Sequence, residues 1–95
     1  MNIEITSRHF TASDHLKVLV YEKINKIQKF NNSIINCQVI LTKESNNENV
    51  EIVVHAKGYN FVASVNSHAF ERSLINAIDK ISAQIKKQHE KSVSR

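Results

Sequence analysis

The chain has 95 residues, of which 41% are hydrophobic and 23% charged, which fits one folded domain and excludes a disordered chain. No apolar run approaches the roughly 20 residues of a membrane-spanning helix, and the start Met1-Asn2-Ile3-Glu4 lacks the pattern of a secretory signal. The lone Cys37 has no partner for an internal disulfide, so we expect a single cytoplasmic domain over residues 1–95.

The formal net charge of +4 is unevenly distributed along the chain. Residues 1–30 carry five basic and three acidic side chains, and residues 69–95 carry six and three. Residues 31–68 carry only two basic side chains against three acidic ones. Clustered positive charge of this kind is typical of proteins that bind polyanions, although an ordinary solvated helix face has the same composition.

The first two predicted elements are a strand and a helix. Residues 2–8 alternate apolar and polar side chains, which predicts a strand. Thr11 and Asp14 resemble a capping box that opens a helix over about residues 12–30, with Phe10 as a hydrophobic staple in front of it. The buried stripe of this helix is expected to contain Leu16, Leu19, Val20, Ile24 and Ile27.

Three strands are predicted next, over about residues 34–43, 49–57 and 60–66. Gly58, the only glycine, lies in the turn before the last of them. Alternation places one set of side chains on the inward face, namely Ile35, Cys37, Val39, Leu41, Val50, Ile52, Val54 and Ala56.

A long amphipathic helix is predicted over about residues 69–90. Its apolar side chains recur at steps of three and four and form one buried stripe, consisting of Phe70, Leu74, Ala77, Ile78, Ile81 and Ile85. Phe30, Phe61 and Phe70 fit core positions.

The element order is therefore β-α-β-β-β-α. A right-handed crossover makes the first two strands parallel if they are neighbours, and the last three form an antiparallel meander. We expect a two-layer α+β domain, in which two helices cover one face of a four-stranded mixed sheet. The other sheet face, which carries Gln38, Glu51, His55 and Lys57, is polar enough to meet water.

The residues do not form a recognisable catalytic or metal-binding motif. A single glycine excludes the nucleophile elbow and the glycine-rich phosphate loops. The five histidines lack the paired spacing of zinc ligands, which applies to His9, His15, His55, His68 and His89. We expect no enzymatic activity, no metal, no cofactor and no small-molecule substrate.

Basic side chains remain as the candidate functional feature. Lys80, Lys87 and Lys91 share one flank of the last helix, whereas Arg72 and Lys86 point further round. Lysines also occur at every third residue of the first helix, at Lys23, Lys26 and Lys29. If the helices pack side by side, the two lysine rows face each other across a groove suited to a phosphate backbone. The alternative is a solvated surface that confers solubility.

Several segments together resemble the short ribosome hibernation-promoting factors, also known as the ribosome-associated translation inhibitor or sigma-54 modulation protein family. The resemblance covers essentially the whole domain and is strongest in Ala77-Ile78-Asp79-Lys80-Ile81. The other segments that carry it are Ile3-x-Ile5-Thr6-Ser7, Glu22-Lys23-Ile24-x-Lys26-Ile27-x-Lys29-Phe30, Val39-x-Leu41, Lys43-Glu44, Val62-Ala63-Ser64, Gln84-Ile85-Lys86-Lys87 and Lys91.

The resemblance implies a non-enzymatic factor that binds the small ribosomal subunit in the channel of messenger and transfer RNA. Such a factor stops translation in stationary phase or stress and favours inactive ribosome dimers. Family members contact ribosomal RNA through basic residues of both helices, and Arg8 after the first strand is a further candidate. The RNA-binding residues implied here are Arg8, Lys23, Lys26, Lys29, Lys80, Lys86, Lys87 and Lys91.

The chain departs from the family pattern in two places. Many relatives carry Asp-Met-Tyr at the start of the last helix, where this chain has Ala69-Phe70-Glu71. The sequence also stops at Arg95, which resembles the short members without a second domain or extended tail. That likeness favours promotion of ribosome pairing.

Two other functions fit the same element order. One is a generic double-stranded RNA-binding domain, whose core order is α-β-β-β-α. The segment Ser67-His68-Ala69-Phe70-Glu71 lacks the basic cluster that such domains carry at the start of their last helix. The other is a protein-interaction module that binds a partner through its open sheet face or edge.

Overall fold

The structure is a computed structural model that describes residues 2–27 and 34–93, with side chains described as far as Gln88. The strands are β1 (Asn2–Arg8), β2 (Ile34–Lys43), β3 (Glu48–Ala56) and β4 (Tyr59–Ser67). The helices are α1 (Asp14–Asn25) and α2 (Phe70–Val93). The expected strands agree with these bounds to within one residue at each end.

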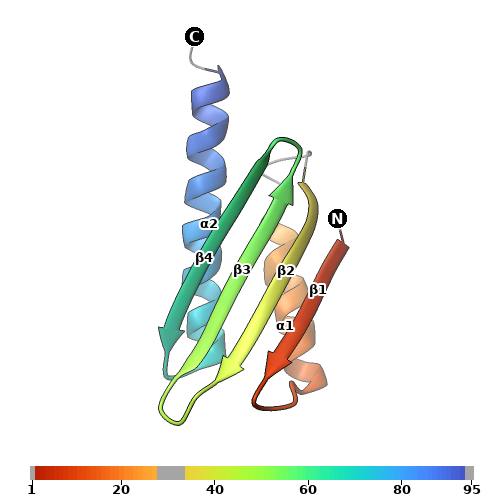
Figure 1. Ribbon diagram of the computed structural model, residues 1–95, viewed down its shortest axis with the longest axis vertical. Coiled ribbons are helices and arrows are strands. Elements are labelled where there is room, and N and C mark those ends of the chain that lie inside the picture. Colours follow the sequence, from red (N-terminus) through yellow and green to blue (C-terminus); the bar gives the residue numbers. More distant parts are fainter. Residues whose placement is uncertain (1, 28–33, 94–95) are drawn as a thin grey trace.

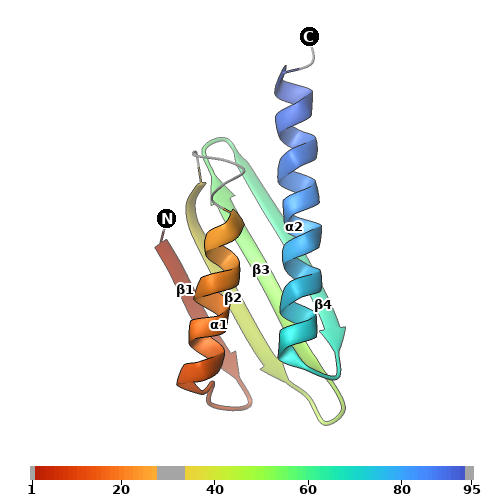
Figure 2. The ribbon, with the colours of Figure 1, turned by 180° about the vertical axis from the view of Figure 1, so that it is seen from behind.

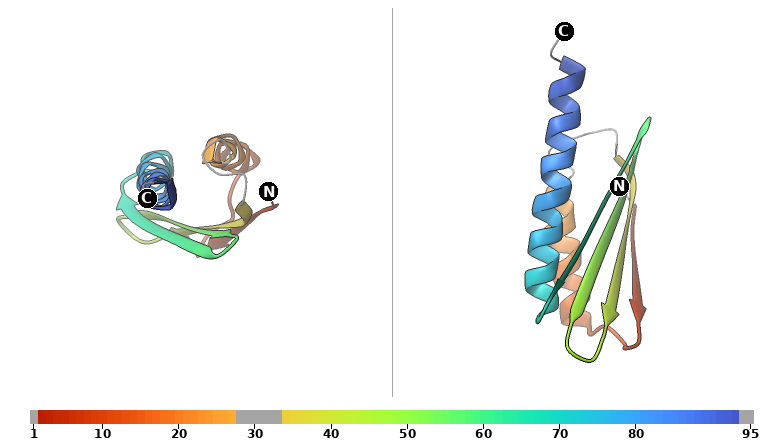
Figure 3. Two further views of the ribbon diagram at one scale, coloured as in Figure 1. Left: turned by 90° about the horizontal axis from the view of Figure 1, so that it is seen from above. Right: turned by 60° about the vertical axis from the view of Figure 1, so that its left-hand side comes forward.

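The four strands form one mixed sheet in the order β1-β2-β3-β4, with β1 parallel to β2 and the other neighbours antiparallel (Figure 1). Both helices lie on the same face of this sheet, α1 over β1 and β2 and α2 over β3 and β4 (Figure 2). The view from above shows the two layers and the uncovered second face of the sheet (Figure 3). The predicted two-layer α+β fold is confirmed.

The core lies between the sheet and the helices. Inward side chains of adjacent strands lie opposite one another, such as Cys37 opposite Val54 and Val39 opposite Ile52. The predicted helix stripes cover them, and several core side chains have no exposed surface, including Val20, Ile24, Leu41, Ile52, Leu74 and Ile81. Since burying each such aliphatic side chain contributes about 1.5–3 kcal/mol, this interface holds the two helices at fixed positions.

Ile35 does not point inward as expected. Ile34 pairs with Ala56 and Asn36 pairs with His55, so Ile35 is the extra residue of a β-bulge. The bulge shifts the alternation by one, and as a result Ile34 is buried while Ile35 is 60% exposed.

The start of α1 also differs from the expected capping box at Thr11. Ser13 is the N-cap, because its extended backbone lets its Oγ accept a hydrogen bond from the Leu16 N–H at 3.1 Å. At the other end, α1 stops at Asn25, and Lys26 and Ile27 form a tighter 3₁₀ turn. The expected continuation to Phe30 and the stop at Asn31-Asn32-Ser33 lie outside the described residues.

Phe10 does not occupy the staple position of α1, because the N-cap is Ser13 and the residue before it is Ala12. Its ring stacks on the ring of Phe70 at the start of α2, with centroids 4.8 Å apart and an interplanar angle of 17°. Both helices begin at the same end of the sheet (Figure 2). The Phe10–Phe70 pair therefore joins the segment before α1 to the first turn of α2.

Polar contacts fix the start of α2 to β3. The Glu48 Oε1 accepts a hydrogen bond from the Phe70 N–H at 2.7 Å, and the buried Ser73 hydroxyl donates to the Glu48 carbonyl at 2.6 Å. Ser67 Oγ lies 2.6 Å from Ser73 Oγ and accepts from the Ala69 N–H. The negative carboxylate sits at the positive end of the helix dipole, where it stabilises the helix. Although the first residues of this helix differ from the usual family pattern, they are firmly held.

Candidate nucleic-acid interface

Lys23 of α1 and Lys26 of the 3₁₀ turn that follows it lie on the flank that faces α2. Lys23 and Lys26 line a narrow hollow of about 170 Å³ between the helices, and the opposite wall consists of Ile75, Ile78 and Asp79. Lys23 is half-buried and Lys26 is exposed, so their aliphatic stems lie against the hollow while both ammonium groups can reach solvent. The inter-helix hollow is therefore basic on the α1 side.

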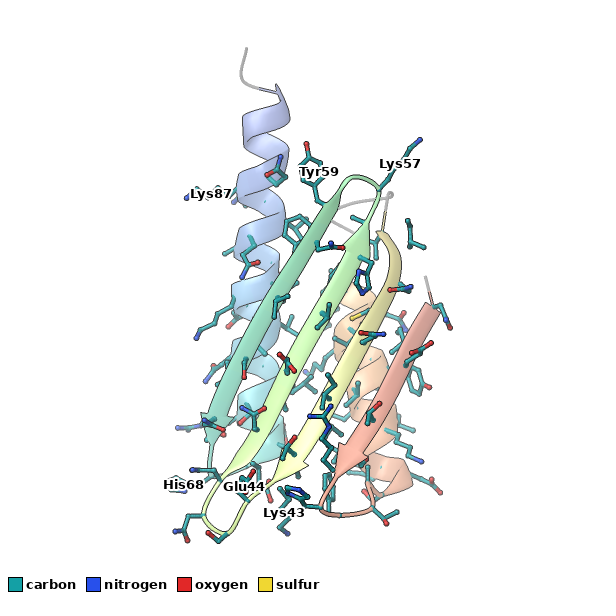
Figure 4. The ribbon with its side chains drawn as sticks, in the orientation of Figure 1. Lys43, Glu44, Lys57, Tyr59, His68 and Lys87 are labelled. Atoms are coloured by element: carbon teal, nitrogen blue, oxygen red, sulfur yellow. The ribbon has the colours of Figure 1, made fainter. Side chains whose placement is uncertain are left out.

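The lysines expected to face them from α2 lie elsewhere. Gln84, which shares a helix flank with Lys80 and Lys87, donates a hydrogen bond from Nε2 to the Val62 carbonyl of β4 at 2.9 Å. This flank therefore borders the outer edge of the sheet, and Lys87 points away from α1 (Figure 4). The expectation that the two lysine rows face each other across the groove is wrong for the described residues.

Lys86 belongs to the opposite flank of α2. It shares a helix face with Ile75 and Asp79, which line the hollow beside Lys23 and Lys26. Ile75 also lines a wider, open hollow of about 560 Å³ towards the start of α2, together with Ala69, Glu71, Arg72 and Asn76. The helix layer thus carries cations on two sides, one beside the inter-helix hollow and one beside β4.

Arg72, which is not among the RNA-binding residues that the resemblance implies, adds a cation to the face that Ile75 occupies. Its spacing of three from Ile75 and seven from Asp79 was visible in the sequence. That spacing groups residues on a helix face but does not show which face lies beside α1.

Arg8 is not part of the helix layer. It ends β1 opposite Thr42, in a row that continues through Asn49 and Asn66 on the uncovered face of the sheet. The structure therefore places Arg8 on the other side of the molecule from the helix lysines. Of the remaining candidates, Lys29 lies outside the described residues, and the side chain of Lys91 is not among those described.

The charges of the helix lysines are not neutralised within the described chain. The ion pair found there joins Lys43 Nζ to Glu48 Oε2 at 3.9 Å, at the end of the sheet where α2 begins. Asp79 shares the hollow with Lys23 and Lys26 without forming an ion pair with either of them. Unpaired ammonium groups on a rigid surface are available to phosphate oxygens.

Cys37 is the buried thiol of the core. Burial without a compensating charge raises its pKa from 9.0 to about 12, so the thiol is protonated and unreactive at neutral pH.

Two other kinds of site are absent from the described residues. No three His, Cys, Asp or Glu side chains of the described residues come together in an arrangement that would bind a metal ion. Neither described helix combines the length and the apolar character needed to cross a lipid bilayer.

Known proteins resemble this chain along nearly its full length. Ribosome hibernation promoting factor of Azotobacter vinelandii is 27% identical over 95 residues, which cover 100% of this chain and 89% of that protein. Ribosome hibernation promoting factor of Pseudomonas putida is 28% identical over 94 residues, which cover 99% of this chain and 92% of that protein.

Solved structures share the fold. The N-terminal domain of Protein Y from Thermus thermophilus matches with a TM-score of 0.86 at 19% identity, covering 93% of this chain and 99% of that one. A ribosomal subunit interface protein from Coxiella burnetii matches with a TM-score of 0.88 at 22% identity, covering 94% and 98%. The family described as Sigma 54 modulation protein / S30EA ribosomal protein matches residues 3–93, and the chain belongs to this family.

Proposed function

We propose that this protein is a non-enzymatic ribosome hibernation factor of the cytoplasm. It binds ribosomal RNA of the small subunit in the channel for messenger and transfer RNA, and it inhibits translation in stationary phase or stress by occupying that channel. The observation that carries the proposal is the set of cations on the helix layer that form no ion pair among the described residues, in a chain of this family. The curated relatives are named for the same process.

The proposed mechanism requires only binding to ribosomal RNA and the steric volume of the folded domain. Lysines on a rigid layer replace counterions along the RNA backbone, which gives affinity without a catalytic group. The core fixes both helices on one sheet, so the cations keep their spacing when they meet RNA. A folded body held in the channel then excludes messenger and transfer RNA sterically.

Both sides of the helix layer contribute to this interface. Lys23 and Lys26 line the inter-helix hollow, and Lys86 lies two turns beyond Asp79 on the face of α2 that lines it. Lys80 and Lys87 lie on the flank beside β4. Lys29 and Lys91 follow these lysines in the sequence and are further candidates. Because Arg8 lies on the uncovered sheet face, it would contact a different RNA segment or none.

A generic double-stranded RNA-binding domain fits the structure less well. In such a domain the start of the last helix faces phosphate, and the positive helix dipole favours that contact. Here the Glu48 carboxylate already occupies the N-terminus of α2 by accepting from the Phe70 N–H. The negative charge of this carboxylate would repel a phosphate at the same position.

Co-sedimentation with separated small and large ribosomal subunits tests the proposal. At low salt, we expect the protein to pellet with small subunits and to dissociate as salt rises. The variant Lys86→Glu/Lys87→Glu should lose most of this binding, because it reverses one charge on each side of the helix layer. A wild-type protein that stays in the supernatant at low salt would show that the proposal is wrong. Wild-type binding that the variant retains would refute the assignment of these lysines.

We propose further that the bound factor favours inactive ribosome dimers. A sucrose gradient of purified ribosomes with and without the protein measures this directly. A heavier ribosome peak that grows with added protein supports pairing. An unchanged single-ribosome peak in which the protein co-migrates shows that it silences ribosomes singly.

A further inference from the structure

The two edges of the sheet differ in whether their outer backbone groups form hydrogen bonds with another element. At the outer edge of β4, the Val62 carbonyl accepts a hydrogen bond from Gln84 Nε2 of α2 at 2.9 Å. At the other edge, β1 pairs only with β2, and no described residue forms a hydrogen bond with its outer side. An uncovered edge strand presents free N–H and C=O groups that can pair with another strand.

The exposed side chains of β1 carry opposite charges at a suitable spacing. Glu4, Thr6 and Arg8 all lie on the uncovered face of the sheet and are exposed. Glu4 lies beside Gln38 and Arg8 beside Thr42, and neither charge forms an ion pair with a described residue. Glu4 and Arg8 lie two residues before and two residues after Thr6. When two copies of the strand run in opposite directions with Thr6 opposite Thr6, each negative side chain therefore lies opposite a positive one.

We propose that β1 pairs antiparallel with β1 of a second copy of this chain, with the two-fold axis at Thr6. Thr6 then lies opposite Thr6, and each Glu4 lies opposite Arg8 of the other copy. Both charge pairs form at once because the contact is symmetric, and directly opposed pairs of this kind stabilise antiparallel strands. The two sheets become one continuous sheet whose outer edges are the β4 strands, so the assembly closes at two copies.

The position of α1 fits the same arrangement. This helix lies over β1 and β2, so two copies of α1 would run side by side about two strand spacings apart, roughly 10 Å. Helices pack at about that distance. Tyr21 lies about 160° round the helix from Lys23 and hence on the flank away from α2. With Val18 it leaves apolar surface on α1, since their side chains are 44% and 53% exposed.

A cysteine placed on the two-fold axis tests the register. Opposed residues of antiparallel strands have Cα atoms about 4.5–5.5 Å apart, which is within disulfide range. We expect Thr6→Cys to form a disulfide dimer rapidly under mild oxidation, since the native Cys37 is buried. Asn2→Cys is the matched control, because its two copies would be roughly 27 Å apart along the strands. Equal rates for the two variants would overturn the proposal.

Charge exchange tests the contact without a covalent link. In analytical ultracentrifugation over a dilution series, we expect Glu4→Arg and Arg8→Glu each to weaken self-association of the full chain. The double variant Glu4→Arg/Arg8→Glu should restore it, because both pairs are rebuilt with their signs exchanged. Circular dichroism confirms that each variant is folded. A monomeric wild-type protein at the highest concentration, or a double variant no better than either single one, contradicts the proposal. Neither experiment uses ribosomes, so the outcome is independent of the proposed function.

Discussion

Removing the Glu48 carboxylate should loosen the start of α2 and destabilise the whole domain. The Glu48 side chain accepts from the Phe70 N–H at 2.7 Å and lies 3.9 Å from Lys43 Nζ. Loss of a capping acceptor costs about 0.5–2 kcal/mol. The ion pair adds little, less than about 1 kcal/mol, because the Lys43 side chain is 56% exposed. We expect Glu48→Ala to lower the free energy of unfolding by about 2 kcal/mol.

Urea unfolding followed by circular dichroism measures this loss of free energy. In thermal unfolding of a domain of this size, about 2 kcal/mol corresponds to a fall of roughly 8–16 °C in the melting temperature. Glu48→Gln keeps an acceptor oxygen but loses the charge, so its effect should be about half as large. Glu44→Ala is the matched control, since Glu44 is exposed in the β2–β3 connection just before Glu48 and lies outside the capping contacts. If Glu44→Ala and Glu48→Ala destabilise the protein equally, the capping role of Glu48 is wrong.

Two further predictions concern charge and burial. Each lysine that contacts a phosphate contributes about 0.7–0.9 to the slope of log K against log salt, so Lys23→Gln/Lys26→Gln should lower this slope for small-subunit binding by about 1.4–1.8. Lys43→Gln/Lys57→Gln removes the same charge from outside the helix layer and should leave the slope unchanged. The reverse result would place the interface outside the helix layer. Because burial raises the Cys37 pKa from 9.0 to about 12, its contribution to stability is complete below pH 9 and declines above it. Urea titrations should show that the free energy of unfolding declines above pH 9 by up to about 1.4 kcal/mol per pH unit. Cys37→Ala should lack this part of the decline. An equal pH dependence in the wild-type protein and the variant would contradict the role of Cys37.

Periodic patterns were sufficient to predict most of the fold. The alternation of Val50, Ile52 and Val54 identified the inward face of β3, and the three-and-four spacing through Leu74 and Ile81 identified the buried side of α2. Both patterns arise from burial against a single neighbouring layer, which is recorded directly in the order of apolar residues.

Local choices that depend on one hydrogen bond or one extra residue were not predictable. Thr11 and Ser13 are both acceptable caps, and the structure selects Ser13 because its Oγ reaches the Leu16 N–H. Ile34 and Ile35 are chemically identical, and only the pairing with β3 shows which of them is buried. Such alternatives have similar local energies, so tertiary contacts decide between them.

The candidate interface was predicted in composition but not in arrangement. Spacing correctly grouped Lys80 with Lys87 on one flank of α2 and separated them from Lys86. It could not show that the flank of Lys80 and Lys87 lies beside β4, where Gln84 bonds to Val62, nor that the flank of Lys86 is the one that faces α1. Helical periodicity defines which residues share a face, whereas the neighbour of that face is set by packing in three dimensions.

Competition for the decoding channel tests the central claim most directly. Small ribosomal subunits are loaded with messenger RNA and initiator transfer RNA, and binding of the protein is compared with binding to empty subunits at the same salt concentration. Steric occupation of the channel predicts that loaded subunits bind far less protein and that added protein releases transfer RNA. Equal binding to loaded and empty subunits, with transfer RNA retained, would contradict the proposed mode of inhibition.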